Sequence, residues 1–439
     1  MQTPHPFPRH VLLALALAAA LNASAQTYEV KPPGAEFEKF NPLLAPPVST
    51  TLLLQKGDRL AICGDSITEQ KMYSRIIETY LTVCVPELAV TVRQYGWSGE
   101  RASGFLRRMT NDCLRFRPTI ATTCYGMNDH RYVPWTEEIG RDYRVNSLGV
   151  IRAFKAAGVR VIHGSPGPVT KMPGWVKTAT GTVEDLNLSL CELRNDGIRM
   201  AAEERVAFAD IFWPMHTANY FARKQYGPDY SVAGKDGVHP GWAGQLVMAY
   251  AFLKAMGLDG DLGTLTVDLA KGKATATRGH EVTGATQGEF TFRSSRYPFC
   301  ATGDVNSDQS IRSGMTLVPF NQELNRLMLV AKGAKAGRYQ VTWGATSRSY
   351  SGAELAKGVN LAADFVENPF SAAFKKVDDA VLAKQSYETK QIKTEFRSAE
   401  AKQDMEAVVQ RTEAERAPLA EAVAKALVPV EHTIRIHRE

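Results

Sequence analysis

The sequence predicts an α/β protein whose parallel sheet is covered by helices on both faces. Five short apolar runs have the composition of buried strands, at residues 59–63, 90–92, 119–124, 159–163 and 205–209. Helix-like segments alternate with these runs, a pattern typical of a parallel sheet buried on both sides. Ligands bind at the carboxyl ends of the strands in such sheets, so the residues after each run are the first candidates for a site.

The order of these elements predicts one domain over residues 51–258. The first run ends in Gly64, Asp65 and Ser66 and leads into a helical stretch over residues 71–83. Further helix-like segments occupy residues 141–157, 185–203 and 241–256. We expect such helices to return the chain to the start of the next parallel strand.

The composition changes near residue 258, which predicts a β-rich domain over residues 259–355. Apolar and polar residues alternate at residues 264–269 and 339–343, and glycines are frequent between them. A period of two is typical of half-buried strands, so we expect a small antiparallel β unit. Its composition leaves two roles open: it shapes the specificity of a neighbouring site, or it binds a glycan independently.

Residues 356–439 are predicted to form a charged helical region. Ala, Glu and Lys dominate residues 378–427, and only Pro418 interrupts the helical pattern. The region is either a solvated helix pair or a docking or oligomerisation element whose apolar seam contains Met405, Val408 and Val409. The sequence leaves this choice open, and with it the oligomeric state.

Residues 1–25 have the pattern of a signal peptide. A basic segment ending at His10 precedes an apolar run over residues 11–21, and a small-x-small cleavage site ends at Ala25. The run is shorter than the roughly 20 apolar residues of a membrane span. We therefore expect cleavage near Ala25 and export to the periplasm or the extracellular space. The proline-rich residues 26–50 are expected to form an extended lead-in.

Charge and composition exclude several classes of function. The 439 residues carry a formal net charge of +6 without a dense basic tract, so nucleic-acid binding is not expected. No later stretch is long and apolar enough for stable membrane insertion. No cysteine spacing is typical of a metal site, and Cys63 and Cys124 are expected to be free and buried. Pairing stays open for the other four cysteines, Cys84, Cys113, Cys191 and Cys300.

Two polar clusters contain the groups of a nucleophilic site. The first is Gly64, Asp65 and Ser66. A serine at a strand-to-helix turn exposes its hydroxyl and places its N–H near a helix N-terminus, which favours an attack that creates an oxyanion. The last cluster contains Asp236 and His239. A carboxylate three residues before a histidine orients the imidazole and stabilises the imidazolium that forms when the ring takes a proton from serine.

Two further clusters contain hydrogen-bond donors. Residues 96–101 are glycine-rich, which lets the backbone approach a ligand closely and present an N–H. Residues 125–129 follow the third strand and include Asn128, whose side-chain amide is suited to a developing negative charge. Each cluster alone is a common turn. Together, with Ser66 and His239 separated by 173 residues, the four bracket one α/β domain.

In these four blocks the sequence resembles the SGNH (GDSL-like) hydrolase superfamily, named for its Ser, Gly, Asn and His blocks. The match covers roughly residues 55–258. The resemblance implies a flavodoxin-like three-layer αβα domain and a secreted serine esterase, which acts through an acyl-enzyme and needs neither a metal nor an organic cofactor.

The resemblance also implies a role for each block. Ser66 is the expected nucleophile, and His239 is the general base, oriented by Asp236. The expected oxyanion hole consists of the backbone N–H groups of Ser66 and Gly99 and the side-chain amide of Asn128.

The sequence departs from the family pattern at two positions. Ile67 stands where the namesake motif has leucine, and this change removes no catalytic atom. Gln94 stands where many members carry asparagine, which leaves open how the loop that follows it is held.

The residues beside the blocks favour an O-acetyl ester on a carbohydrate as substrate. Aromatic and polar side chains gather there, namely Trp97, Arg101, His130, Arg131 and Tyr132. The arrangement Gly-x-Ser-Gly followed by Arg101 also resembles members that deacetylate plant-wall polysaccharides. The alternatives are a lipid or lysophospholipid acylhydrolase and a catalytically silent glycan-binding protein.

Overall fold

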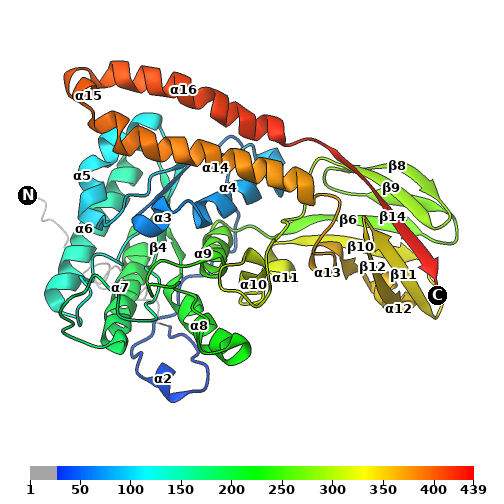
Figure 1. Cartoon of the computed structure of the whole chain (residues 1–439), viewed down its shortest axis with the longest axis horizontal. Coiled ribbons are helices and arrows are strands. Elements are labelled where there is room, and N and C mark those ends of the chain that lie inside the picture. Colours follow the sequence, from blue (N-terminus) through cyan, green and yellow to red (C-terminus); the bar gives the residue numbers. More distant parts are fainter. Residues whose placement is uncertain (1–26) are drawn as a thin grey trace, which may run out of the picture. The chain divides into compact units, whose positions relative to one another are not determined.

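The computed structural model describes residues 27–439 (Figure 1). Contacts divide the chain into two units, one ending at Pro46 and the other beginning at Pro47. The predicted signal peptide lies outside the described residues, so its cleavage near Ala25 stays a prediction.

The described part of the first unit is not extended throughout. Tyr28 and Leu44 form a single antiparallel bridge, and a short helix, α2 (Ala35–Glu38), lies between them. The expectation of an extended lead-in is therefore wrong for these four residues. Residues 34–41 contain no proline, which permits the helical turn.

Five parallel strands form the central sheet of the second unit, in the order β2-β1-β3-β4-β5. Each lies within or overlaps one of the predicted apolar runs: β1 (Arg59–Gly64), β2 (Thr91–Gln94), β3 (Ile120–Cys124), β4 (Arg160–Gly164) and β5 (Ala207–Ala209). A parallel sheet with β2 outside β1 is the flavodoxin-like arrangement. The predicted α/β class is therefore confirmed.

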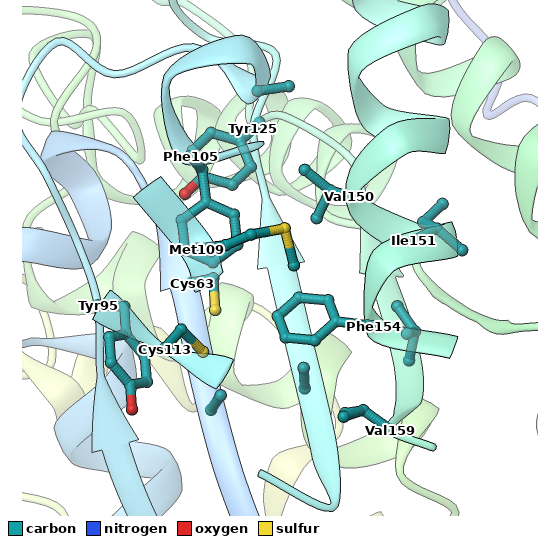
Figure 2. Packing of buried hydrophobic residues seen from close by; sticks show 14 of the residues in the cluster. Cys63, Tyr95, Phe105, Met109, Cys113, Tyr125, Val150, Ile151, Phe154 and Val159 are labelled. Carbon is teal, nitrogen blue, oxygen red and sulfur yellow. The ribbon is translucent and has the colours of Figure 1, made fainter. Parts of the chain in front are cut away.

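Three helices cover one face of this sheet: α5 (Ala102–Asp112), α6 (Glu137–Ala156) and α7 (Val183–Glu204). Figure 2 shows the core beneath α5 and α6, where Phe105 and Phe154 have ring centroids 6.0 Å apart. Burying side chains of this size removes a large apolar area from water, which is the main force that holds the layers together.

The other face is covered by α4 (Tyr73–Val83) and α9 (Trp242–Ala255). Tyr73 and Phe252 stack across these two helices, with ring centroids 5.6 Å apart. The short helix α3 (Ser66–Glu69) directly follows β1, at the carboxyl end of the sheet.

The β-rich domain consists of two sheets. One has the order β13-β10-β6-β7, and the other has the order β12-β11-β14-β9-β8 (Figure 1). The strands are β6 (Asp261–Asp268), β7 (Lys273–Ala276), β8 (His280–Thr286), β9 (Glu289–Ser294), β10 (Arg326–Lys332), β11 (Arg338–Trp343), β12 (Thr346–Ser351), β13 (Val359–Asn360) and β14 (Val430–Arg438).

Two expectations about the C-terminal half need correction. The β unit is not purely antiparallel, because β6 and β10 pair in parallel; a long connection separates them, as parallel pairing requires. Residues 356–439 are not helical to the end, because β14 inserts between β9 and β11. Apolar and polar side chains alternate along β14, with His432, Ile434 and Ile436 buried, which suits a strand.

The helices of the C-terminal region pack against the central parallel sheet and its neighbouring helices. Helix α14 (Ser371–Lys393) is followed by α15 (Ala399–Gln403) and α16 (Met405–Ala426) (Figure 1). Pro418 does not end the last of these helices, contrary to the predicted interruption. Val408 is completely buried in the core cluster shared with α5 and α6, and Met405 and Val409 pack against that cluster. The apolar seam of the tail thus docks on its own chain.

Helix α14 also covers the open edge of the sheet at β2. Lys384 Nζ donates a hydrogen bond to the Val92 carbonyl at 2.7 Å, and the Gln94 N–H donates to Glu388 Oε2 at 3.1 Å. Since β2 is the outermost strand, these side chains satisfy backbone groups that have no strand partner.

All six cysteines are free and buried. The expectation for Cys63 and Cys124 is confirmed, and the pairing left open for the other four does not occur. Among residues 27–439, no helix combines the length and apolar character needed to cross a membrane.

Candidate active site

Ser66 lies at the turn that joins β1 to α3. Asp65 caps α3, because its Oδ1 accepts a hydrogen bond from the Ile67 N–H at 3.0 Å. Ser66 is the first residue of that helix, so its own N–H has no intrahelical acceptor. The turn therefore presents a hydroxyl and a free N–H together at the carboxyl end of the sheet.

Asp236 and His239 lie on the tight loop that precedes α9. Asp236 Oδ1 accepts hydrogen bonds from the N–H groups of Val238, at 2.9 Å, and His239, at 2.8 Å. Its Oδ2 lies 2.7 Å from His239 Nδ1. Partial burial raises the pKa of Asp236, but these three donors outweigh burial and hold the pKa below its ordinary value. Asp236 is therefore a charged carboxylate against the ring.

The structure brings Ser66, His239 and Asp236 into one hydrogen-bonded series. Ser66 Oγ lies 2.8 Å from His239 Nε2. A carboxylate at Nδ1 fixes the tautomer that carries its proton there, so Nε2 is the acceptor for the serine hydroxyl. This geometry permits transfer of the hydroxyl proton to the ring.

The three predicted oxyanion donors belong to residues that follow β1, β2 and β3, at the carboxyl end of the sheet. Gly99 is exposed and has a φ of +73°, and a side chain at this position would meet no atom within 4 Å, so the loop is open here. Asn128 Nδ2 donates to the Glu100 carbonyl at 3.1 Å and to Asp65 Oδ2 at the longer distance of 3.3 Å. These two contacts hold the Asn128 amide in place.

Two buried carboxyl groups, Asp65 and Asp129, fix the turns around the site. Burial raises the pKa of Asp65 to about 7 and that of Asp129 to about 6, although each accepts backbone hydrogen bonds. Asp129 accepts from the N–H groups of Gly126, at 3.0 Å, and Ala102, at 3.1 Å. It therefore joins the turn after β3 to the start of α5.

The loop that follows Gln94 is held by the glutamine itself. Gln94 Oε1 accepts a hydrogen bond from the Gly96 N–H, and its Nε2 donates to Thr389 Oγ1 of α14 at 2.7 Å. The longer amide side chain thus reaches both the loop and the C-terminal helix. Gln94 therefore holds the loop that follows it, although position 94 has no asparagine.

The side chains expected beside the site separate into two groups. Arg101 is exposed, and Tyr132 is half-buried beside the site. The other three are engaged within the protein. His130 is fully buried, Arg131 pairs with Glu138 and Asp142, and the Trp97 ring lies close to cations, namely Arg108, Lys393 and Arg397.

Sequence reasoning missed an aromatic residue beside the histidine. The Trp175 ring centroid lies 5.7 Å from that of His239 and 5.7 Å from that of Tyr132, which it meets edge to face. Trp175 is 44% exposed. It belongs to an irregular loop without hydrophobic periodicity, and only its position after Pro173 and Gly174 marked it as a loop aromatic.

No group of three or more His, Cys, Asp or Glu side chains within residues 27–439 is arranged to hold a metal ion. The polar side chains around Ser66 instead form the hydrogen bonds with one another that are described above.

Comparisons with known proteins agree with this fold. The GDSL-like lipase/acylhydrolase family matches residues 62–247. A gut microbial diltiazem-metabolizing enzyme has a similar structure, with a TM-score of 0.72 at 21% identity, over 89% of this chain and 99% of that one. No curated protein sequence matches the chain.

Two smaller structures match about half of the chain. An acetylxylan esterase from Geobacillus stearothermophilus has a TM-score of 0.38 at 21% identity, over 47% of this chain and 97% of that one. An alpha/beta hydrolase enzyme from the metagenome of Lake Arreo, Spain, has a TM-score of 0.38 at 19% identity, over 47% and 98%. The four blocks lie within residues 62–247, so this segment of the chain is similar to the GDSL-like lipase/acylhydrolase family.

Proposed function

We propose that this chain is a serine ester hydrolase with Ser66 as nucleophile, His239 as general base and Asp236 as the group that orients His239. The observation that carries the proposal is the hydrogen-bonded series of the three side chains, with distances of 2.8 Å and 2.7 Å. This is the arrangement that activates a serine hydroxyl in acyl transfer.

In the proposed reaction Ser66 Oγ attacks the ester carbonyl carbon while His239 takes the hydroxyl proton. The N–H groups of Ser66 and Gly99 and the Asn128 amide stabilise the negative oxygen of the tetrahedral intermediate. His239 then gives its proton to the departing alkoxide, which leaves an acyl-serine. A water molecule repeats the sequence, releases the acid and restores the hydroxyl.

The proposed substrates are O-acyl esters of carbohydrates, foremost O-acetyl esters. The support is Trp175, which lies beside His239, because the face of an exposed tryptophan suits the apolar face of a sugar ring. Trp175 is 44% exposed and is held edge to face by Tyr132. The exposed Arg101, in the loop that carries Gly99, provides hydrogen-bond donors for hydroxyl groups.

Hydrolysis of p-nitrophenyl esters from acetate to palmitate tests the reaction, with wild type and Ser66→Ala compared side by side. We expect activity on short acyl groups and its loss in the variant. Acetylated xylooligosaccharides then test the substrate class. Trp175→Ala should raise KM for the oligosaccharide while changing KM for p-nitrophenyl acetate little, because only the sugar reaches the tryptophan.

The same assays separate the alternatives. Preference for long acyl groups would favour a lipid or lysophospholipid acylhydrolase and overturn the carbohydrate proposal. A folded wild type that hydrolyses no ester, yet binds oligosaccharide as well as Ser66→Ala does, would indicate a silent glycan-binding protein. Diltiazem is a useful further probe, because the structurally similar gut enzyme metabolises it.

We further propose that the chain is exported after cleavage at Ala25. The support is the basic segment, the short apolar run and the small-x-small site in residues 1–25. Mass spectrometry of the protein recovered outside the cytoplasm should find Gln26 as its first residue. Recovery of the full-length chain in the cytoplasm would overturn this proposal.

A further inference from the structure

The loop that carries Gly99 is fixed at its beginning but open at Gly99 itself. We call residues 95–101 the second loop. The Trp97 N–H donates to the Gly64 carbonyl at 3.0 Å, and a side chain at Gly96 would lie 2.2 Å from the Glu69 nitrogen, so this part packs tightly on α3. Gly99 has no such neighbour within 4 Å. The direction of its N–H therefore depends on the turn in which the Glu100 N–H donates to the Trp97 carbonyl at 3.1 Å, and on the other residue within that turn, Ser98.

Ser98 is held by a carboxylate that a distant helix positions. The Ser98 N–H donates to Glu69 Oε2 at 2.5 Å. Lys393 Nζ, on the last residue of α14, donates to Glu69 Oε1 at 2.7 Å and to Oε2 at 2.8 Å. Because the lysine contacts both oxygens, it fixes the plane of the Glu69 carboxylate. It thereby also fixes the position of Oε2, which accepts the hydrogen bond from the Ser98 N–H.

Lys393 and its neighbour Arg397 also surround the Trp97 ring. Lys393 Nζ lies 5.3 Å and Arg397 Cζ lies 5.1 Å from the ring centroid, and Arg108 of α5 lies at 5.1 Å. Arg397 is itself held by Asp112 at 2.5 Å. Cations at this distance are attracted to the ring face, so the end of α14 restrains Trp97 as well as Ser98.

We propose that Lys393 is a positioning residue that sets the direction of the Gly99 N–H through Glu69 and Ser98. The C-terminal helix α14 is then part of the apparatus that stabilises the oxyanion. The inference rests on the proposed esterase function, since it concerns a donor of that reaction. Its physical basis is that oxyanion donors act by being held in advance where the charge develops, so a small misplacement lowers the rate.

Removal of the lysine should lower kcat and leave KM nearly unchanged. In Lys393→Met the Glu69 carboxylate loses its fixed plane and is free to turn toward solvent. We expect kcat for p-nitrophenyl acetate to fall about tenfold, less than the roughly 10²- to 10³-fold loss of a whole donor. Lys393→Arg should retain most of the activity, because guanidinium also bonds a carboxylate at two oxygens.

Lys390→Met is the matched control. Lys390 lies one turn before Lys393 on the same helix and also pairs with a glutamate, Glu395, at 3.2 Å, while its ring contact is with Tyr387 rather than Trp97. We expect kcat within twofold of wild type. Equal losses in Lys390→Met and Lys393→Met would mean that helix stability, rather than loop position, is responsible, and would overturn the inference.

A second readout measures the oxyanion hole directly. An arylboronic acid forms a tetrahedral adduct with the serine oxygen, with a boronate oxygen at the oxyanion position. Its Kd should rise in Lys393→Met by the same factor as kcat falls. The ion pair is partly exposed, with exposed side-chain fractions of 27% and 21%. Sodium chloride at 1 M should therefore lower kcat of wild type but not of Lys393→Met.

The outcomes separate the inference from the proposed function. Unchanged kcat and boronate affinity in Lys393→Met, or a rise in KM alone, would overturn the inference while the esterase proposal stands. A folded wild type without esterase activity would overturn the proposed function. The inference would then be decided by the boronate affinity of Lys393→Met compared with that of Lys390→Met. A wild type that binds no boronate would overturn both. If Lys393→Met does not fold, Lys393→Gln replaces it in each measurement.

Discussion

At the scale of single residues, burial sets the properties of the polar groups around Ser66. Asp65 is 2% exposed, and Asp129 is 8% exposed. Both have raised pKa values, because their surroundings disfavour the charged form. Asp236 is more exposed and accepts three hydrogen bonds, which lowers its pKa. Three aspartates of one site thus differ in pKa through their local environments.

The amide of Asn128 gives a prediction about the oxyanion. Asn128→Ala should lower kcat on p-nitrophenyl acetate by about 10² to 10³ with little change in KM, because the donor acts on the transition state. Asn128→Asp, which keeps the shape but removes the NH₂, should lose at least as much. Steady-state kinetics of both variants checks this. A loss expressed mainly in KM would contradict the role.

The raised pKa of Asp65 gives a prediction about stability and pH. Its folded pKa is about 7, against 3.8 for an ordinary aspartate. The folded state therefore holds this proton more tightly, and the contribution to stability is complete below pH 4 and is lost as pH rises to 7. Asp65→Asn keeps an oxygen for the α3 cap but does not titrate.

Relative to wild type, the free energy of unfolding of Asp65→Asn should therefore rise between pH 4 and pH 8. The expected gain is roughly 4 kcal/mol, because each tenfold difference in proton affinity between the folded and unfolded states corresponds to about 1.4 kcal/mol. Urea unfolding of both proteins at the two pH values measures it. A pH-independent difference would show that Asp65 is not the titrating group.

At the scale of elements, α14 contributes buried charges beside the central parallel sheet. Lys384 lies 3.0 Å from Glu78 of α4 and 2.8 Å from Glu388 one turn further along α14, and all three are at least 96% buried. Arg416 of α16 contacts Glu388 at 2.6 Å. The pKa of Glu78 is raised by burial, whereas that of Glu388 is lowered because its two cations outweigh burial.

Removal of the central lysine should therefore be costly. Lys384→Met leaves Glu78 without its cation, and we expect a loss of roughly 3–5 kcal/mol in the free energy of unfolding. Lys375→Met is the control on the same helix, because Lys375 pairs with Asp379 at the exposed surface, where such pairs contribute well under 1 kcal/mol. Urea unfolding at neutral pH compares the two. Similar losses would refute the importance of the buried pair.

At the scale of the whole chain, the last strand ties the β-rich domain together. His432 of β14 accepts the Trp343 indole N–H of β11 at 3.0 Å and lies 2.9 Å from Ser294 Oγ of β9. Ser294 contacts His280 of β8, whose Nε2 donates to the Leu262 carbonyl in the other sheet. Burial lowers the pKa of His432 to about 3, so the ring is neutral in the folded protein.

His432→Ala should destabilise the protein by about 3 kcal/mol, because it leaves the Trp343 N–H and Ser294 without their partner. His437→Ala in the same strand is the control, since His437 is exposed. Thermal unfolding measures the difference. Because the folded pKa of His432 is depressed, its contribution is present above pH 6.5 and is lost as pH falls toward 3. An acid-induced loss equal in both variants would contradict this role.

The sequence predicted the strands of the α/β domain well because their signals are local. Apolar runs marked the strands, and the turn residues after them marked Ser66, Asn128 and the loop of Asp236 and His239. A buried parallel strand and a loop at its end are each encoded within a few residues, so periodicity and turn chemistry reveal them. The meeting of Ser66 with His239 and Asp236 then followed from the parallel order of the strands, whose carboxyl ends lie at one edge of the sheet.

Only the tertiary structure decided what joins distant segments. Lys393 and Glu69 are 324 residues apart in the sequence. Strand β14, near the end of the chain, is inserted into the sheet that contains β8 and β9 and therefore pairs with a strand that comes much earlier in the sequence. Trp175 reaches His239 from an irregular loop. Such contacts depend on how the layers pack against one another, and no local sequence pattern encodes this packing. The sequence by itself therefore determined the chemistry of the site, while packing decided which elements hold that site in place.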